Sequence, residues 1–166
     1  MLYLDTSLLV AALTNEAETL QMQGWLGEQD PDDLVISDWV AAEFSAALSI
    51  KLRTAALEAS HRAQAMTTFT RLCDENLKVV PVTSMQFRVA ARFADQYALG
   101  LRAGDGLHLA VCAEHGATIC TLDRRLVEAA SELGVKTALL CTSFVPGQSG
   151  DSRPCSKLPS RNAWRH

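Results

Sequence analysis

Short apolar runs that end at polar or turn residues alternate along the chain with longer segments of helical periodicity. The apolar runs have the length of buried strands, and the segments between them contain few helix breakers. Strands separated by helices of this length favour a parallel sheet with helices on both faces. We expect strands near residues 2–5, 33–36, 78–82, 117–121 and 135–139, and helices near 7–14, 16–28, 38–52, 55–76, 84–97, 104–115 and 124–132.

Two segments depart from this alternation. Helices 38–52 and 55–76 follow each other without a strand, which predicts a helical hairpin inserted into the α/β fold. Residues 144–166 are rich in Pro, Gly, Ser and Arg and have no periodicity, which is typical of a flexible tail. The alternative is an arm that docks on a partner subunit or on RNA. We therefore expect one α/β domain of about five strands over residues 1–143, followed by a basic tail.

The composition is that of an ordinary globular protein, with 48% hydrophobic and 20% charged residues among 166. No apolar run approaches the roughly 20 residues that cross a bilayer, and no basic segment precedes the N-terminal apolar stretch. The five cysteines are widely spaced and include no C-x-x-C pair, so they indicate neither a disulfide framework nor a zinc site. We expect a cytoplasmic protein without a membrane segment.

The net charge of −4 has the wrong sign for a nucleic-acid-binding protein. The excess of basic over acidic residues in the tail makes the body of the chain more acidic still. Any nucleic acid would therefore need a local basic rim or bound cations.

Two aspartates follow predicted strands. Asp5 ends the first strand, in MLYLDTSLL, and Asp123 follows the fourth, in TICTLDRRL. Each precedes a helical segment, so each has an ordinary explanation as a helix N-cap. However, parallel strands bring their carboxyl ends to one edge of the sheet, where α/β proteins bind ligands. The two carboxylates are therefore expected at the same edge.

Two further carboxylates stand at positions that ordinary surface residues rarely occupy. Glu43 lies within the apolar stripe of its helix, three residues after Val40, although a solvated position at the margin of the stripe remains open. Asp105 lies in the first turn of a helix, where the helix dipole stabilises it, and Gly104 and Gly106 flank it. Small residues there permit close approach by a ligand or a neighbouring backbone. His108, one turn on, is expected to be a hydrogen-bonded, partly buried histidine.

Asp5, Glu43, Asp105 and Asp123 are predicted to converge on one pocket. Four ionised carboxylates repel one another, so the pocket would need a cation. Mg²⁺ or Mn²⁺ suits oxygen ligands, and no Cys/His cluster offers a zinc alternative. Acidic pockets of this type support metal-assisted phosphodiester hydrolysis.

In order and spacing, LDTSLLVAAL, the Glu43 segment, LRAGDGLHLAVC and TLDRRL resemble the four acidic motifs of the PIN domain, and within it the VapC-type toxins of type II toxin–antitoxin systems. The resemblance spans about residues 1–141. It implies a Mg²⁺- or Mn²⁺-dependent endoribonuclease, usually a homodimer, that a cognate antitoxin holds inactive. On this resemblance, the groove for the antitoxin is expected on the helical hairpin around residues 40–70.

The resemblance also implies roles for individual residues. Asp5, Asp105 and Asp123 would bind the metal, Asp123 directly or through water, and Glu43 would be the second acidic residue of the site. Thr6 or Ser7 would hydrogen-bond a metal-bound carboxylate or water, although starting the first helix is an equally ordinary role. Gly106 departs from the family, which often has Ala there, and the long basic tail is also outside the usual pattern.

Candidates for the basic rim are Arg124 and Arg125, next to Asp123, and then Lys51, Arg53 and Arg62, near the turn of the hairpin. For each of them, an ordinary solvated surface charge is the simpler explanation. An aspartyl-phosphate phosphatase is a rival enzyme, but its chemistry wants a carboxylate where Ser7 stands. The non-enzymatic alternative is a PIN-like scaffold that binds RNA or protein without cleavage.

Overall fold

The computed structural model describes residues 1–140, which form an α/β fold around a five-stranded sheet. All strand pairs are parallel, and the strand order is β3-β2-β1-β4-β5. This confirms the predicted fold class. The strands are β1 (Leu2–Leu4), β2 (Leu34–Ser37), β3 (Lys78–Val80), β4 (Thr118–Thr121) and β5 (Thr137–Leu139).

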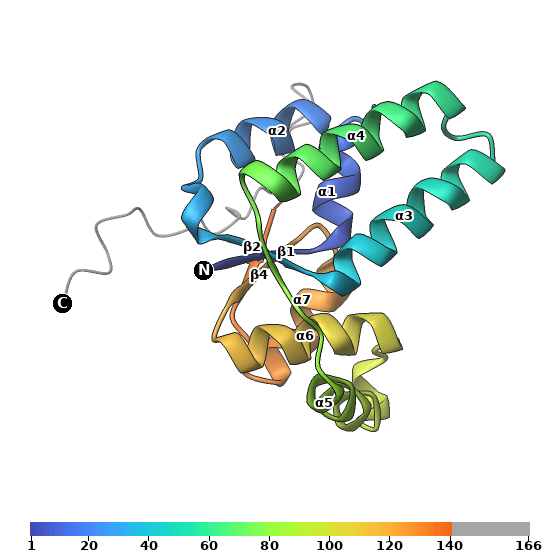
Figure 1. Ribbon diagram of the computed structural model, residues 1–166. Helices are drawn as coiled ribbons and strands as arrows, with labels where there is room; N and C mark the ends of the chain where they lie inside the picture. Colours follow the sequence, from blue (N-terminus) through green and yellow to red (C-terminus); the bar gives the residue numbers. More distant parts are fainter. Residues whose placement is uncertain (141–166) are drawn as a thin grey trace, which may run out of the picture.

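Helices cover both faces of the sheet, which is seen almost edge-on in Figure 1. On one face lie α1 (Thr6–Leu13), α2 (Thr19–Gly27) and the hairpin of α3 (Asp38–Arg53) and α4 (Ala59–Glu75). On the other lie α5 (Ser84–Ala94), α6 (Ala103–His115) and α7 (Arg124–Glu132). Two short 3₁₀ turns, Pro31–Asp33 and Tyr97–Leu99, complete the elements.

The predicted hairpin is present, but its second helix begins later than expected. The chain leaves α3 after Arg53, and Ala55 adopts a left-handed backbone with φ of 57°. The N–H groups of Ala56 and Leu57 both donate to the carbonyl of Lys51, which closes the turn and delays α4 until Ala59. The helix predicted over 84–97 is also wrong at its end, because α5 stops at Ala94 and a 3₁₀ turn follows.

The sheet is buried because helices pack against it from both sides. Leu4, Ile36 and Ile119 on three neighbouring strands are fully buried, as continuous apolar strands of a parallel sheet should be. Stacked rings of Phe44 and Phe69, with centroids 4.4 Å apart, join α3 to α4 within the same core. The hairpin is therefore anchored to the domain at its base and extends away from the sheet (Figure 1).

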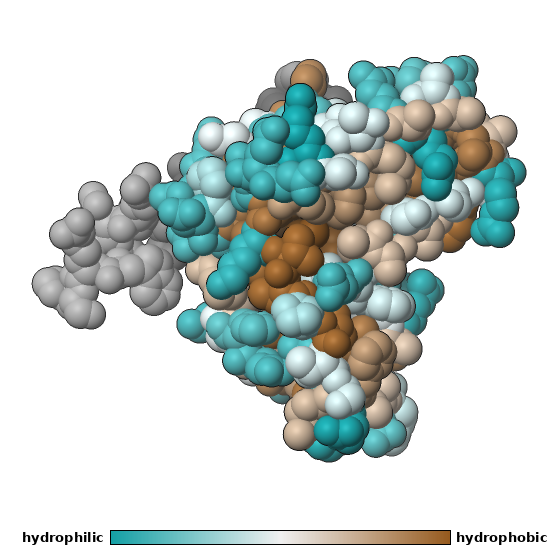
Figure 2. All heavy atoms as spheres, in the orientation of Figure 1, coloured by the Kyte–Doolittle hydropathy of each residue, from teal (hydrophilic) through white to brown (hydrophobic). Residues whose placement is uncertain are grey.

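One face of the molecule exposes apolar side chains. Figure 2 shows an apolar band that follows β3, the edge strand, across this face toward α5. Exposed large apolar residues on these two elements are Val79 on β3 and Met85 and Phe87 on α5. This edge of the sheet is thus only partly protected from solvent.

Three cysteines fall within the described residues, and Cys73, Cys112 and Cys120 are all free thiols. No helix of residues 1–140 is both long and apolar enough to traverse a membrane. The predicted tail, 144–166, and the end of the predicted domain lie outside the described residues.

Candidate active site

The acidic site begins at the carboxyl end of β1, the strand at which the order of strands in the sheet reverses. From β1 the chain builds outward through β2 and β3, whereas β4 and β5 lie on the other side of β1. Such a switch point leaves a crevice beyond the strand ends, which is where open α/β sheets bind ligands. Leu4 pairs with Cys120, so the next residues along each strand, Asp5 and Thr121, stand opposite each other at this crevice.

Asp5 is only 6% exposed, and hydroxyl groups satisfy one of its two oxygens. Its Oδ2 accepts hydrogen bonds from Ser7 Oγ at 2.6 Å and Thr121 Oγ1 at 2.7 Å, and a longer one from the Ser7 N–H. Asp5 is thus an N-cap, as its position suggested, but it is also part of a buried network. Its Oδ1 has one weak contact, 3.5 Å to His108 Nε2. Oδ1 is therefore the oxygen left for a ligand.

Glu43 joins the site from α3 through His108 and Thr6. Its Oε2 accepts from Thr6 Oγ1 at 2.8 Å and from His108 Nε2 at 2.7 Å. Burial alone would raise the pKa of Glu43, but the hydrogen bonds from His108 and Thr6 and the proximity of the imidazole together lower it. The Glu43 side chain keeps 30% exposure, so it is partly solvated, as the alternative prediction had it, but two hydrogen bonds also hold it in the site. His108 is hydrogen-bonded, as predicted, and at 2% exposure it is more deeply buried than expected.

A buried polar chain continues from His108 into the core. His108 Nδ1 lies 2.9 Å from the hydroxyl of Tyr3, which lies 2.7 Å from Ser37 Oγ. Ser37 occupies the N-cap position of α3, but its side chain makes no capping hydrogen bond and pairs with the Tyr3 hydroxyl instead. Burial raises the pKa of Tyr3 far above its ordinary value, so this hydroxyl stays neutral.

Gly104 provides the space for Glu43. A Cβ atom at Gly104 would lie 2.6 Å from Glu43 Oε1 and 3.4 Å from the ring of Trp39. Side chains do not approach this closely, so any larger residue would displace the carboxylate. A small residue at position 104 does permit close approach, but the group that approaches is the Glu43 side chain and not a ligand or a backbone.

Asp105 and Asp123 form the outer part of the site. They line one small pocket of about 110 Å³, which also includes Arg102 and Arg125. Asp105 Oδ2 accepts from the Arg102 N–H at 3.1 Å, while Asp123 is exposed and caps α7 through the N–H groups of Arg125 and Leu126. Burial raises the pKa of Asp105; the charges of Asp123 and Asp5 act in the same direction, while the Arg102 N–H and His108 oppose it.

The four predicted carboxylates thus lie at one edge of the sheet, in two linked groups. Asp5 and Glu43 share His108, Asp105 and Asp123 share a pocket, and Asp105 is within electrostatic reach of Asp5. Within residues 1–140, however, no three acidic, histidine or cysteine side chains are close enough to form a metal cage. The donor set consists of oxygens, which suits a hydrated Mg²⁺ that takes one or two carboxylates and keeps several waters.

The basic candidates differ in position. Arg125 faces the acidic pocket, whereas Arg124 is exposed and does not line it. Among the described residues, no arginine forms an ion pair with a carboxylate, so Arg102 and Arg125 stand beside Asp105 and Asp123 without being neutralised by them. At the hairpin, Lys51 pairs with Glu16 at 2.7 Å. Arg62 donates to Ser49, and Arg53 lies in the last turn of α3.

Sequence reasoning missed Thr121, Tyr3 and Arg102. Thr121 gave no local signal, because its position opposite Asp5 depends on the register of β4 against β1. Tyr3 gave none, since an aromatic residue in an apolar strand is ordinary. Arg102 was hidden because it precedes α6 and follows the 3₁₀ turn Tyr97–Leu99, which ends at Gly100 with φ of 61°.

Fold and site together define an α/β protein with an acidic centre at the topological switch point of a parallel sheet. The family model of the PIN domain matches residues 2–132. The chain belongs to the PIN domain family. No curated protein sequence matches the chain at a significant level.

Solved structures of similar fold include toxin-family proteins of low sequence identity. FitAcB from Neisseria gonorrhoeae is 17% identical, with a TM-score of 0.60, over 82% of this chain and 96% of that one. VapC20 from Mycobacterium tuberculosis, a sarcin–ricin loop cleaving toxin, is 17% identical, with a TM-score of 0.63, over 78% and 95%. VapBC2 from Rickettsia felis, bound to promoter DNA, is 14% identical, with a TM-score of 0.61, over 85% and 100%.

Proposed function

We propose that this chain is the toxin of a type II toxin–antitoxin system and acts as a divalent-metal-dependent endoribonuclease. The observation that carries the proposal is the gathering of Asp5, Glu43, Asp105 and Asp123 at the switch point of a PIN fold. Asp5 is buried and Glu43 and Asp105 are partly buried, and holding several carboxylates close together without a cation is costly.

The side chains have distinct tasks in this proposal. Asp5 would hold Mg²⁺ or Mn²⁺ through Oδ1, with Asp105 and Asp123 as further ligands, directly or through water. The bound ion would supply an activated water and neutralise charge on the phosphodiester. Ser7 and Thr121 keep Asp5 oriented through Oδ2, and Thr6 does the same for Glu43.

Arg125 and Arg102 would contact the phosphates of the RNA. Both line the pocket that holds Asp105 and Asp123, and a guanidinium can grip a phosphate with two parallel hydrogen bonds. The role predicted for Arg124 remains a proposal for a phosphate farther along the strand. For RNA binding, the net charge of the chain then matters less than the electrostatic potential at the site once a metal ion is bound.

A cognate antitoxin and a second copy of the chain are the proposed protein partners, and the cytoplasm is the proposed location. Support for the antitoxin comes from the structural neighbours FitAB and VapBC2, which are toxin–antitoxin complexes. The exposed apolar side chains along β3 and α5 are a surface of the kind that oligomers bury.

Cleavage-site sequencing of total RNA tests the proposal. Expression of the wild-type chain should produce new 5′ ends at defined positions, and Asp105→Asn, which removes one acidic ligand, should abolish them. Purified wild-type protein should lose the same cleavage in excess EDTA and regain it with Mn²⁺. RNA binding without any cut, in wild type and variant alike, would instead support the non-cleaving scaffold.

A further inference from the structure

His108 is buried at the centre of the site, although none of the roles described so far requires a histidine. It lies on α6, and its two ring nitrogens contact side chains from three other elements. Nε2 faces Glu43 on α3 and Asp5 after β1, while Nδ1 faces Tyr3 on β1 and, through it, Ser37 at the end of β2.

The hydrogen-bond roles follow from the chemistry of the partners. An ionised carboxylate only accepts hydrogen bonds, so His108 Nε2 is protonated and donates a hydrogen bond to Glu43 Oε2. In the neutral ring Nδ1 then accepts from the Tyr3 hydroxyl, and the Tyr3 oxygen accepts from Ser37 Oγ. Tyr3 and Ser37 are fully buried, so no solvent competes for these bonds. The imidazole is thereby fixed in orientation from the core side.

This arrangement determines which carboxylate oxygens face outward. Glu43 Oε2 is committed to His108 and Thr6, and Asp5 Oδ2 is committed to Ser7 and Thr121. The remaining Asp5 oxygen, Oδ1, lies 3.5 Å from the same Nε2. Among the hydrogen bonds and ion pairs of the described residues, His108 is the one side chain that reaches both carboxylates, so it is placed to fix their relative position.

We propose that His108 is a positioning residue that donates Nε2–H to Glu43 while contacting Asp5 Oδ1, is held by Tyr3 and Ser37, and thereby sets the affinity of the site for a divalent cation. This inference rests on the proposed function, because it assumes that the carboxylates bind an ion. Partners of metal-bound carboxylates typically contribute 10- to 100-fold in affinity or activity.

Calorimetric titration of the purified full chain with Mn²⁺ tests the inference without using activity. His108→Leu removes the Nε2–H and should weaken Mn²⁺ binding by about 10- to 100-fold. His108→Gln can still donate from its amide near the same place and should recover most of the affinity. Tyr3→Phe leaves both carboxylates and the histidine but removes the restraint on Nδ1, and should weaken binding by about 2- to 10-fold.

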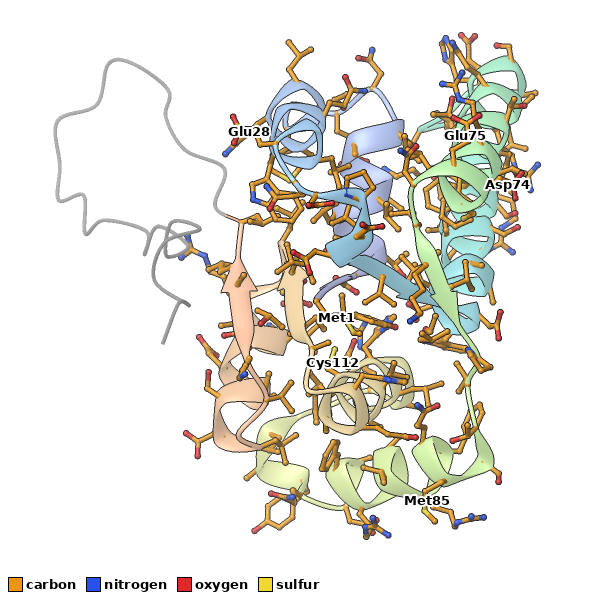
Figure 3. The ribbon with its side chains drawn as sticks, turned by 60° about the vertical axis from the view of Figure 1, so that its left-hand side comes forward. Met1, Glu28, Asp74, Glu75, Met85 and Cys112 are labelled. Atoms are coloured by element: carbon orange, nitrogen blue, oxygen red, sulfur yellow. The ribbon has the colours of Figure 1, made fainter. Side chains whose placement is uncertain are left out.

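Cys112→Ala is the matched control. Cys112 follows His108 by one turn of α6, is equally buried, and lies on the side of the helix that faces the sheet (Figure 3). It should bind Mn²⁺ as wild type does, so that general loosening of α6 is separated from loss of the hydrogen bond. If His108→Leu does not fold, the Tyr3→Phe and Cys112→Ala pair decides the question.

The outcomes separate the two proposals. Wild-type affinity in folded His108→Leu and in Tyr3→Phe, an unrescued His108→Gln, or an equal loss in Cys112→Ala would each overturn the positioning role while leaving the metal site intact. Absence of Mn²⁺ binding by wild type, or unchanged binding in Asp5→Asn, would overturn the metal-dependent function and the inference with it.

Discussion

Asp5→Asn is expected to reduce RNA cleavage by more than about 100-fold. Removing a hydrogen-bond partner of a metal ligand typically costs about 10- to 100-fold, and removing the ligand itself should cost more. The reason lies in the two oxygens of Asp5. Ser7 and Thr121 donate to Oδ2, so the amide oxygen of Asn must take that position. The amide NH₂ then replaces Oδ1 and presents no lone pair to a cation.

The same geometry predicts that Asp5→Asn folds normally. The hydroxyl donors keep their acceptor, the amide NH₂ disturbs only the 3.5 Å contact with His108 Nε2, and the removal of a negative charge relieves repulsion with Asp105. The unfolding temperature should change by less than about 4 °C, which corresponds to roughly 1 kcal/mol for a chain of this size. Asp38→Asn, an exposed aspartate in the first turn of α3, is the charge-matched control and should cleave as wild type does. Full activity in a folded Asp5→Asn protein would contradict the site.

Gly104→Ala should separate activity from stability. The new methyl group would meet Glu43 Oε1 at 2.6 Å, and the end of a glutamate side chain moves more easily than backbone. Ala also has a higher helix propensity than Gly in the first turn of α6, which offsets part of the cost of that movement. We expect a protein as stable as wild type in urea, with cleavage lowered by about 10- to 100-fold because Glu43 leaves its partners.

Gly106→Ala is the matched control on the same helix. Its methyl group would meet the carbonyl oxygen of Ala90 on α5 at 3.1 Å and would not approach Glu43. Cleavage should stay near the wild-type rate even where the packing of α5 on α6 adjusts. Equal activity in Gly104→Ala and Gly106→Ala would show that cleavage does not depend on the space that Gly104 leaves for Glu43.

Local patterns in the sequence were sufficient to predict the elements and their arrangement. Strands such as β1 and β4 are apolar and short, helices separate them, and the alternation leaves a parallel sheet as the simplest solution. The errors occur where backbone geometry is decided by single residues. At Ala55 a left-handed residue delays α4, and no glycine or proline marks that turn in the sequence.

The acidic residues of the site could be predicted because topology brings strand ends together. Asp5 and Asp123 needed only the parallel sheet, and Glu43 stood out within an apolar stripe. The hydrogen bonds that orient these carboxylates could not be predicted. His108, Tyr3, Ser37 and Thr121 are each ordinary in their local segments, and their contacts depend on the register of β1 against β4 and on the packing of α6.

The arrangement of Asp5 differs from the expectation in one chemically useful respect. It was expected to be either a helix cap or a metal ligand, and the two roles are compatible, because Oδ2 caps α1 while Oδ1 has only a 3.5 Å contact with His108 Nε2. A residue with two oxygens can serve a structural and a ligand-binding role at once, so the presence of a cap does not argue against a site.

The most direct test of the central claim is a crystal of the full chain soaked in Mn²⁺ and measured for anomalous scattering at the manganese edge. The account predicts one or two peaks at the carboxyl end of β1, with Asp5 Oδ1 as a direct ligand and Asp105 or Asp123 reached directly or through water. A saturated soak with no peak there, or with Mn²⁺ bound only elsewhere on the surface, would contradict it.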